Sequence, residues 1–132
     1  MVGPGRRNLR KRQSNLLVVN SQNNTQRRPN SALAIMVSTD KHLDYVINMT
    51  SAACAKGKQV KLFFTGKGVL LTMKPQFKRL ADMASVSICD ASFRANGLHG
   101  RQGQVPGVTP MNFTSQARNV EMLAQADRYL VF

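Results

Sequence analysis

The chain alternates short, continuous apolar runs with longer stretches in which apolar residues recur every three or four positions. The clearest run is Ala-Leu-Ala-Ile-Met-Val at residues 32–37, with polar residues on both sides. A run of this length is typical of a strand buried on both faces of a parallel sheet. Similar short runs occupy residues 60–64, 86–89 and 129–132. The pattern therefore predicts four strands separated by longer segments.

The segments between the runs have helical periodicity. After the first run, Ser-Thr-Asp at residues 38–40 offers N-cap side chains, and the helix that follows is closed by Gly57. One stripe of this helix carries Leu43, Val46, Ile47, Thr50 and Cys54. A second helical stretch begins near Val69 and meets Pro75, which predicts two short helices or a break.

The last third of the chain contains a long loop and a final helix. Residues 97–110 are rich in Gly and Pro and predict a surface loop. Thr114 or Ser115 is expected to cap the final helix. Its predicted apolar face consists of Ala117, Val120, Leu123 and Ala124. Strands alternating with helices predict a three-layer α/β domain of flavodoxin-like build, with a mainly parallel sheet and its functional site at the carboxyl ends of the strands.

The positive charge is concentrated at the amino terminus. The formal net charge is +13, and residues 1–30 contribute seven basic residues and no acid, whereas residues 31–132 hold 12 basic and 6 acidic residues. We therefore predict a basic, flexible arm at 1–30 and an α/β domain at 31–132. No apolar run approaches the length of a membrane span, and the opening arginines lack the apolar stretch of an export signal. A cytoplasmic protein without a membrane segment is expected.

The positions of the two cysteines predict different roles for them. They are too few for a disulfide framework and lack the C-x-x-C spacing of zinc or thioredoxin-type sites. Cys89 ends the third predicted strand, where a helix starting just after it would lower the thiol pKa and favour the reactive thiolate. The alternative is a buried, inert thiol. Cys54 lies on the inward stripe of the first helix and is expected in the core.

Four further residues are candidates for a pocket around Cys89. Arg94 and His99 follow it closely and would stabilise a thiolate if the loop folds back; otherwise they are solvated loop residues. Thr65 and Gly66 belong to a Thr-Gly-Lys-Gly turn between strand and helix, which suits either an anion or a plain tight turn. No metal-ligand spacing or complete nucleotide motif is present, so neither a metal nor a cofactor is predicted.

These segments together resemble the DsrE/DsrF/TusD-like proteins over about residues 32–132. The similarity is carried by the segments 34–37, 52–58, 60–69, 88–98 and 126–132. It places Cys89 in a C-x-x-S-x-x-x-x-G pattern. The resemblance implies a sulfur-relay protein in which this cysteine receives sulfane sulfur as a persulfide from a donor protein and passes it to an acceptor protein. It also implies a homo-oligomer, a trimer or hexamer, and it assigns no role to Arg94 or His99.

Three functions remain open at the level of sequence. The first is a sulfur carrier or sulfurtransferase acting through Cys89. The second is a non-catalytic module that binds a nucleotide or another anion at residues 65–68. The third is a nucleic-acid-binding adaptor that uses the basic arm, although the arm lacks the aromatic residues on which single-stranded bases usually stack.

Overall fold

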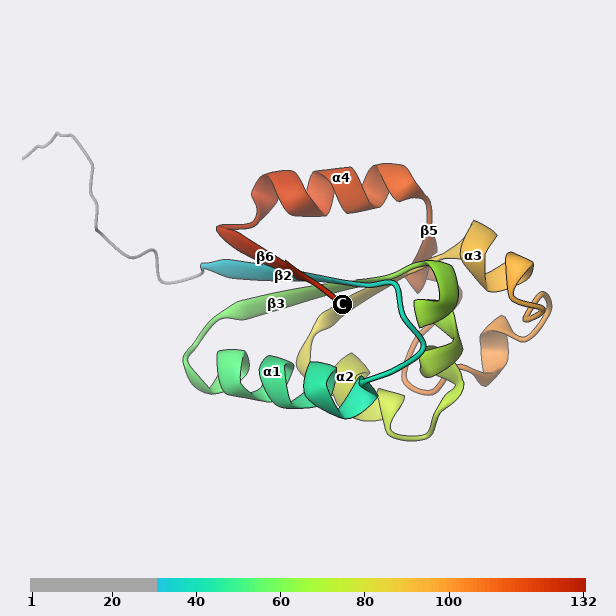
Figure 1. The fold of residues 1–132 in the computed structure, drawn as a ribbon, viewed down its shortest axis with the longest axis horizontal. Coiled ribbons are helices and arrows are strands. Elements are labelled where there is room, and N and C mark those ends of the chain that lie inside the picture. The colour runs from blue at the N-terminus through green and yellow to red at the C-terminus, as the bar shows by residue number, and fades with distance from the viewer. Residues whose placement is uncertain (1–30) are drawn as a thin grey trace, which may run out of the picture.

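The computed structural model describes residues 31–132, and the predicted arm at 1–30 lies outside the described residues. Five parallel strands form one sheet in the order β5-β4-β3-β2-β6 (Figure 1). The strands are β2 (Ala32–Val37), β3 (Gln59–Phe64), β4 (Ser85–Cys89), β5 (Phe113–Thr114) and β6 (Arg128–Val131). The predicted α/β fold with a parallel sheet is confirmed.

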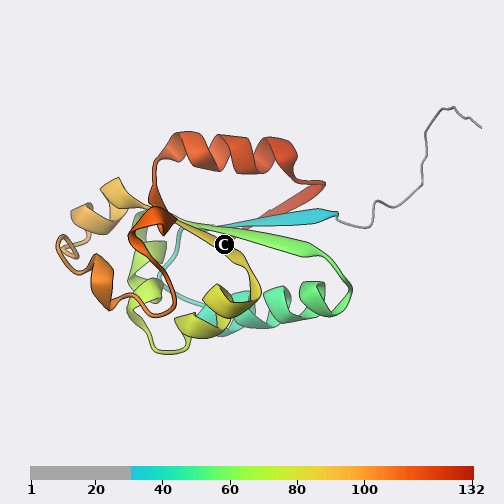
Figure 2. The same cartoon turned by 180° about the vertical axis from the view of Figure 1, so that it is seen from behind.

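Helices cover both faces of this sheet. The α-helices are α1 (Leu43–Ala55), α2 (Phe77–Met83), α3 (Asp90–Ala95) and α4 (Gln116–Gln125), and the 3₁₀ helices are η1 (Gly66–Met73), η2 (Gln102–Gln104) and η3 (Pro110–Asn112). Helices α1 and α2 lie on one face and α4 lies on the other, which makes the predicted three layers (Figure 1). Seen from behind, α3 and the loops after it gather at one end of the sheet (Figure 2). That end is the one where the parallel strands terminate.

The main core fills the space between the sheet and the helices α1 and α2. Ile35 on β2 pairs with Leu62 on β3, and both side chains are fully buried. Phe64 and Phe77 meet edge to face beneath them, with ring centroids 5.2 Å apart. Burial of this apolar surface is the dominant stabilising contribution to such a fold.

The first helix begins differently from the prediction. Its N-cap is His42, in the left-handed conformation with φ of 69° and no side-chain capping bond, so residues 38–40 do not cap it. Those residues belong to the turn that leaves β2, where the Ser38 hydroxyl donates to the carbonyl of Phe132. The inward stripe of α1 is otherwise as predicted, except that Ala53 is buried and Cys54 is only half-buried.

The break predicted at Pro75 is present, because η1 ends at Met73 and α2 starts at Phe77. The turn that opens η1 packs directly onto the end of β2. A Cβ placed on Gly68 would lie 2.2 Å from the Val37 carbonyl oxygen, so only glycine fits there without a shift. This close approach holds Thr65 and Gly66 at the carboxyl edge of the sheet.

The predicted apolar face of α4 is only partly present, because Leu123 is half-buried on the sheet side whereas Ala117, Val120 and Ala124 are exposed. The helix buries Asn119 and Met122, while Val120 is 66% exposed. The Asn119 amide nitrogen donates to Met36 Sδ at 3.5 Å, whereas its Oδ1 is buried without a hydrogen-bond partner among the described residues. The short strand β5, between the predicted loop at 97–110 and the last helix, is not among the predicted strands. Within residues 31–132, no helix has the length and apolarity needed to cross a bilayer.

Candidate functional site

Cys89 is the last residue of β4 and the N-cap of α3. Its sulfur accepts a hydrogen bond from the Ser92 backbone N–H at 3.4 Å. The side chain points to the α4 face of the sheet, where it packs in a small cluster with Ala34, Phe63 and Met122. The predicted helix start immediately after Cys89 is therefore present, and the thiol itself caps that helix.

The thiol is more buried than its position at a strand end indicated. Cys89 is 2% exposed, although it ends a strand at the edge of the sheet where the functional site is predicted. Cys54 is half-buried, with Sγ 3.5 Å from the carbonyl oxygen of Met83, and is thus the more exposed cysteine. Cys89 is buried because α4 packs over the end of β4. Sequence periodicity does not predict such a contact between distant segments.

Polar groups from three elements surround the Cys89 sulfur. The Gln116 amide nitrogen, at the start of α4, lies 3.6 Å from Sγ and donates to Thr65 Oγ1 at 2.8 Å. Thr65 Oγ1 is in turn 3.3 Å from Ser92 Oγ. Gln116, Thr65 and Ser92 are therefore linked in one hydrogen-bonded group next to the thiol.

These donors shift the ionisation of the thiol. Burial raises the pKa of Cys89, but hydrogen bonds from Ser92, from Gln116 and from the Ala91 backbone outweigh it, so the pKa lies below its ordinary value. A lowered pKa increases the fraction of thiolate at neutral pH, and the thiolate is the form that attacks sulfur. The site thus holds a buried sulfur nucleophile supplied with hydrogen-bond donors.

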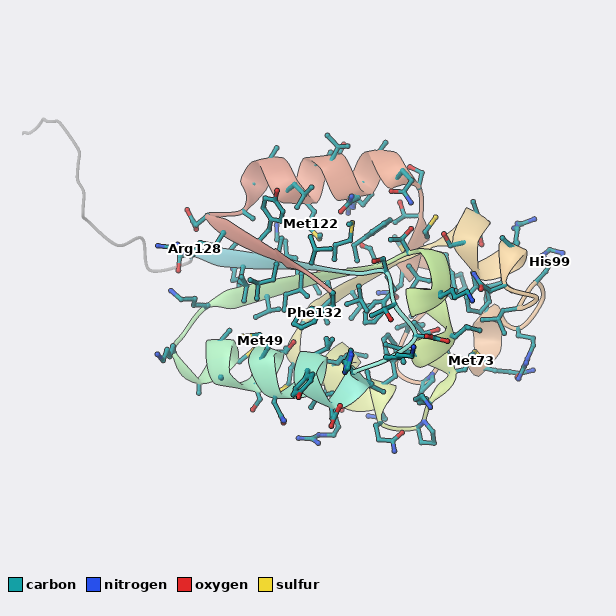
Figure 3. All side chains as sticks on the ribbon, viewed as in Figure 1. Met49, Met73, His99, Met122, Arg128 and Phe132 are labelled. Atoms are coloured by element: carbon teal, nitrogen blue, oxygen red, sulfur yellow. The ribbon has the colours of Figure 1, made fainter. Side chains whose placement is uncertain are left out.

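The predicted pocket residues lie in two groups. Thr65 and Gly66 join the hydrogen-bonded group, because the Gly66 N–H donates to Ser92 Oγ at 2.9 Å. Arg94 instead pairs with Asp90 at 2.8 Å on the exposed side of α3. His99 is exposed in the loop beyond α3 and points outward (Figure 3). Neither Arg94 nor His99 forms a hydrogen bond with Cys89.

Two N–H groups of the Thr-Gly-Lys-Gly turn are already engaged in hydrogen bonds within the protein. Besides the Gly66 bond to Ser92, the Gly68 N–H donates to the Thr65 carbonyl at 2.9 Å. A phosphate held by this turn would have to replace both bonds, so the geometry disfavours an anion site there. Within residues 31–132, no group of three or more His, Cys, Asp or Glu side chains is placed to hold a metal ion.

Sequence reasoning did not identify Ser92 or Gln116 as neighbours of the sulfur. The signal for Ser92 was present, since a residue three positions after an N-cap is the one whose backbone N–H bonds the capping side chain. Gln116 carried no such signal. It lies 27 positions from Cys89 and reaches it only because α4 folds back across the sheet.

The described α/β unit matches the model of a known protein family. None of the curated proteins matches the chain. The model of the DsrE/DsrF-like family matches residues 31–132, which is the whole of the described α/β unit and includes Cys89. With more than half of its length matched, the chain belongs to the DsrE/DsrF-like family.

Proposed function

We propose that the protein is a sulfur-relay protein that carries sulfane sulfur as a persulfide on Cys89. The observation that carries the proposal is the set of donors around a buried sulfur, since Ser92 and Gln116 both donate to Sγ. Donors of this kind stabilise a thiolate, and they suit the anionic persulfide that replaces it equally well. Membership of the DsrE/DsrF-like family supports the same chemistry.

The transfer needs no metal and no external oxidant. The Cys89 thiolate attacks the outer sulfur of a donor persulfide, R–S–SH, forming a new S–S bond as the donor S–S bond breaks. The donor leaves as the thiolate R–S⁻, and Cys89 holds the –S–SH group. An acceptor thiolate then attacks that outer sulfur and returns Cys89 to its thiolate. The partners are therefore a persulfide-bearing donor and a thiol-bearing acceptor.

We also propose that the protein is a homo-oligomer, a trimer or hexamer, that works in the cytoplasm. The edge strand β6 exposes Tyr129, Leu130 and Val131 (58%, 36% and 55% exposed), and Met49 of α1 is 41% exposed. Apolar side chains that crowd one open sheet edge are typical of a surface covered by another subunit. Both cysteines are unpaired, which suits a reducing compartment.

One experiment tests the relay and the assembly together. The full chain is incubated with a low-molecular-weight persulfide and examined by native mass spectrometry, which reports subunit number and added sulfur. We expect wild type and Cys54→Ser to gain the mass of one sulfur atom per subunit and Cys89→Ser to gain none. Sulfur that loads equally onto Cys89→Ser would contradict the relay, and a monomeric mass would contradict the proposed assembly.

A further inference from the structure

The side chain of Gln116 lies between the buried thiol and the solvent. Gln116 is an exposed residue, whereas Cys89 behind it is buried. Its amide nitrogen contacts Cys89 Sγ at 3.6 Å and Thr65 Oγ1 at 2.8 Å. The side chain thus bridges the start of α4 and the turn after β3 at the place where the strands end.

We propose that Gln116 is the gate residue of Cys89, closing the approach to the thiol in the resting protein and admitting a sulfur donor when its side chain rotates away from Thr65. This inference rests on the proposed function, because a carrier must exchange sulfur with two partners yet protect the bound sulfur between exchanges. A thiol that is 2% exposed cannot meet a partner sulfur without a local movement.

Gln116 is the group best placed to make that movement. It is the first residue of α4, and the N-cap, Ser115, makes no side-chain capping bond. Its amide nitrogen donates two hydrogen bonds, one to Thr65 Oγ1 and one to Cys89 Sγ. Only the bond to Thr65 is short. The helix is anchored further along by the buried residues Asn119 and Met122. The glutamine can therefore rotate while α4 stays on the sheet.

The same amide group both covers the sulfur and donates to it. Removing it should have two separable effects on the reaction of Cys89 with an uncharged alkylating reagent. Loss of cover should raise the rate at high pH, where every thiol is ionised and only access matters. Loss of the donor should raise the apparent pKa, because the thiolate loses one of the hydrogen bonds that favour it.

The test is the pH profile of alkylation by iodoacetamide, measured on the full chain with Cys54→Ser so that only one thiol reacts. Gln116→Ala should raise the high-pH plateau several-fold and shift the midpoint to higher pH. Gln116→Met keeps the bulk and lacks the donor, so it should shift the midpoint while leaving the plateau near the parent value. Gln125→Ala is the matched control: an exposed glutamine at the other end of α4, bonded to Lys61. It should change neither quantity.

The outcomes separate the gate from a merely structural role. A plateau in Gln116→Ala equal to that of the parent would overturn the proposal, and so would an equal rise in Gln125→Ala, which would mean that α4 as a whole loosens. Thermal melting of each variant shows that folding is intact. Alkylation needs no sulfur donor. If sulfur loading fails, the relay function is contradicted, but the alkylation profile still tests whether Gln116 controls access to Cys89.

Discussion

The face of the sheet under α1 and α2 and the face under α4 differ in what fills them. The first holds a cluster of eighteen buried apolar residues, including Phe64 and Phe77, whereas the second holds four, and one of these is Cys89. The α4 face also carries two polar side chains: Asn119 contacts Met36, and Gln116 contacts Cys89. The larger apolar core thus lies on one face of the sheet, and the candidate site lies on the other.

The largest expected effect is a difference between the two faces in their contribution to the free energy of unfolding. Phe77→Ala should lower the free energy of unfolding by about 3–5 kcal/mol, because it opens a cavity in the main core. Met122→Ala should cost less, about 2 kcal/mol, since its cluster is small and the residue is 6% exposed. Urea unfolding followed by circular dichroism measures both. Equal losses of unfolding free energy in the two variants would contradict the difference between the two faces.

A second, smaller effect concerns the turn that brings Thr65 to the thiol. Gly68→Ala should destabilise the protein by about 1–3 kcal/mol, because the new methyl group meets the Val37 carbonyl and the backbone must shift. Gly103→Ala is the matched control, since nothing lies within 4 Å of its Cβ position, and it should change stability by less than about 0.5 kcal/mol. If Gly68→Ala behaves like the control, the turn is not held by close packing on β2.

The smallest expected effect is a pH dependence of stability that comes from Cys89 on the α4 face. The folded pKa of Cys89 lies below its unfolded value, so the folded protein releases the thiol proton first as pH rises. The stabilisation is fully present above the unfolded pKa and is lost as pH falls through the folded pKa. The stability difference between wild type and Cys89→Ser should therefore grow from pH 6 to pH 9.5, measured by thermal melting.

A difference between wild type and Cys89→Ser that stays flat over this pH range would contradict the assignment of the pH dependence to the Cys89 thiol.

Much of the α1 and α2 face could be predicted from the sequence, because its signals are local. The run at β2 matched the strand Ala32–Val37, and Pro75 broke the helical stretch. On the other face, a local signal of the same kind placed Cys89 at the end of a strand just before a helix. Each of these features depends on residues within one or two helical turns of one another. Propensity, periodicity and proline geometry act over that range.

The α4 face depended on tertiary structure. The rotation of α4 that buries Asn119, the cover over Cys89 and the reach of Gln116 to its sulfur all arise from contacts between distant segments. The two-residue strand β5 is likewise formed by its pairing with β4. The sequence by itself determined the order of the elements and the position of the candidate sulfur, Cys89, along the chain. Only the packing of α4 across the sheet decided how that sulfur is enclosed, because enclosure is a property of long-range contacts that no local pattern records.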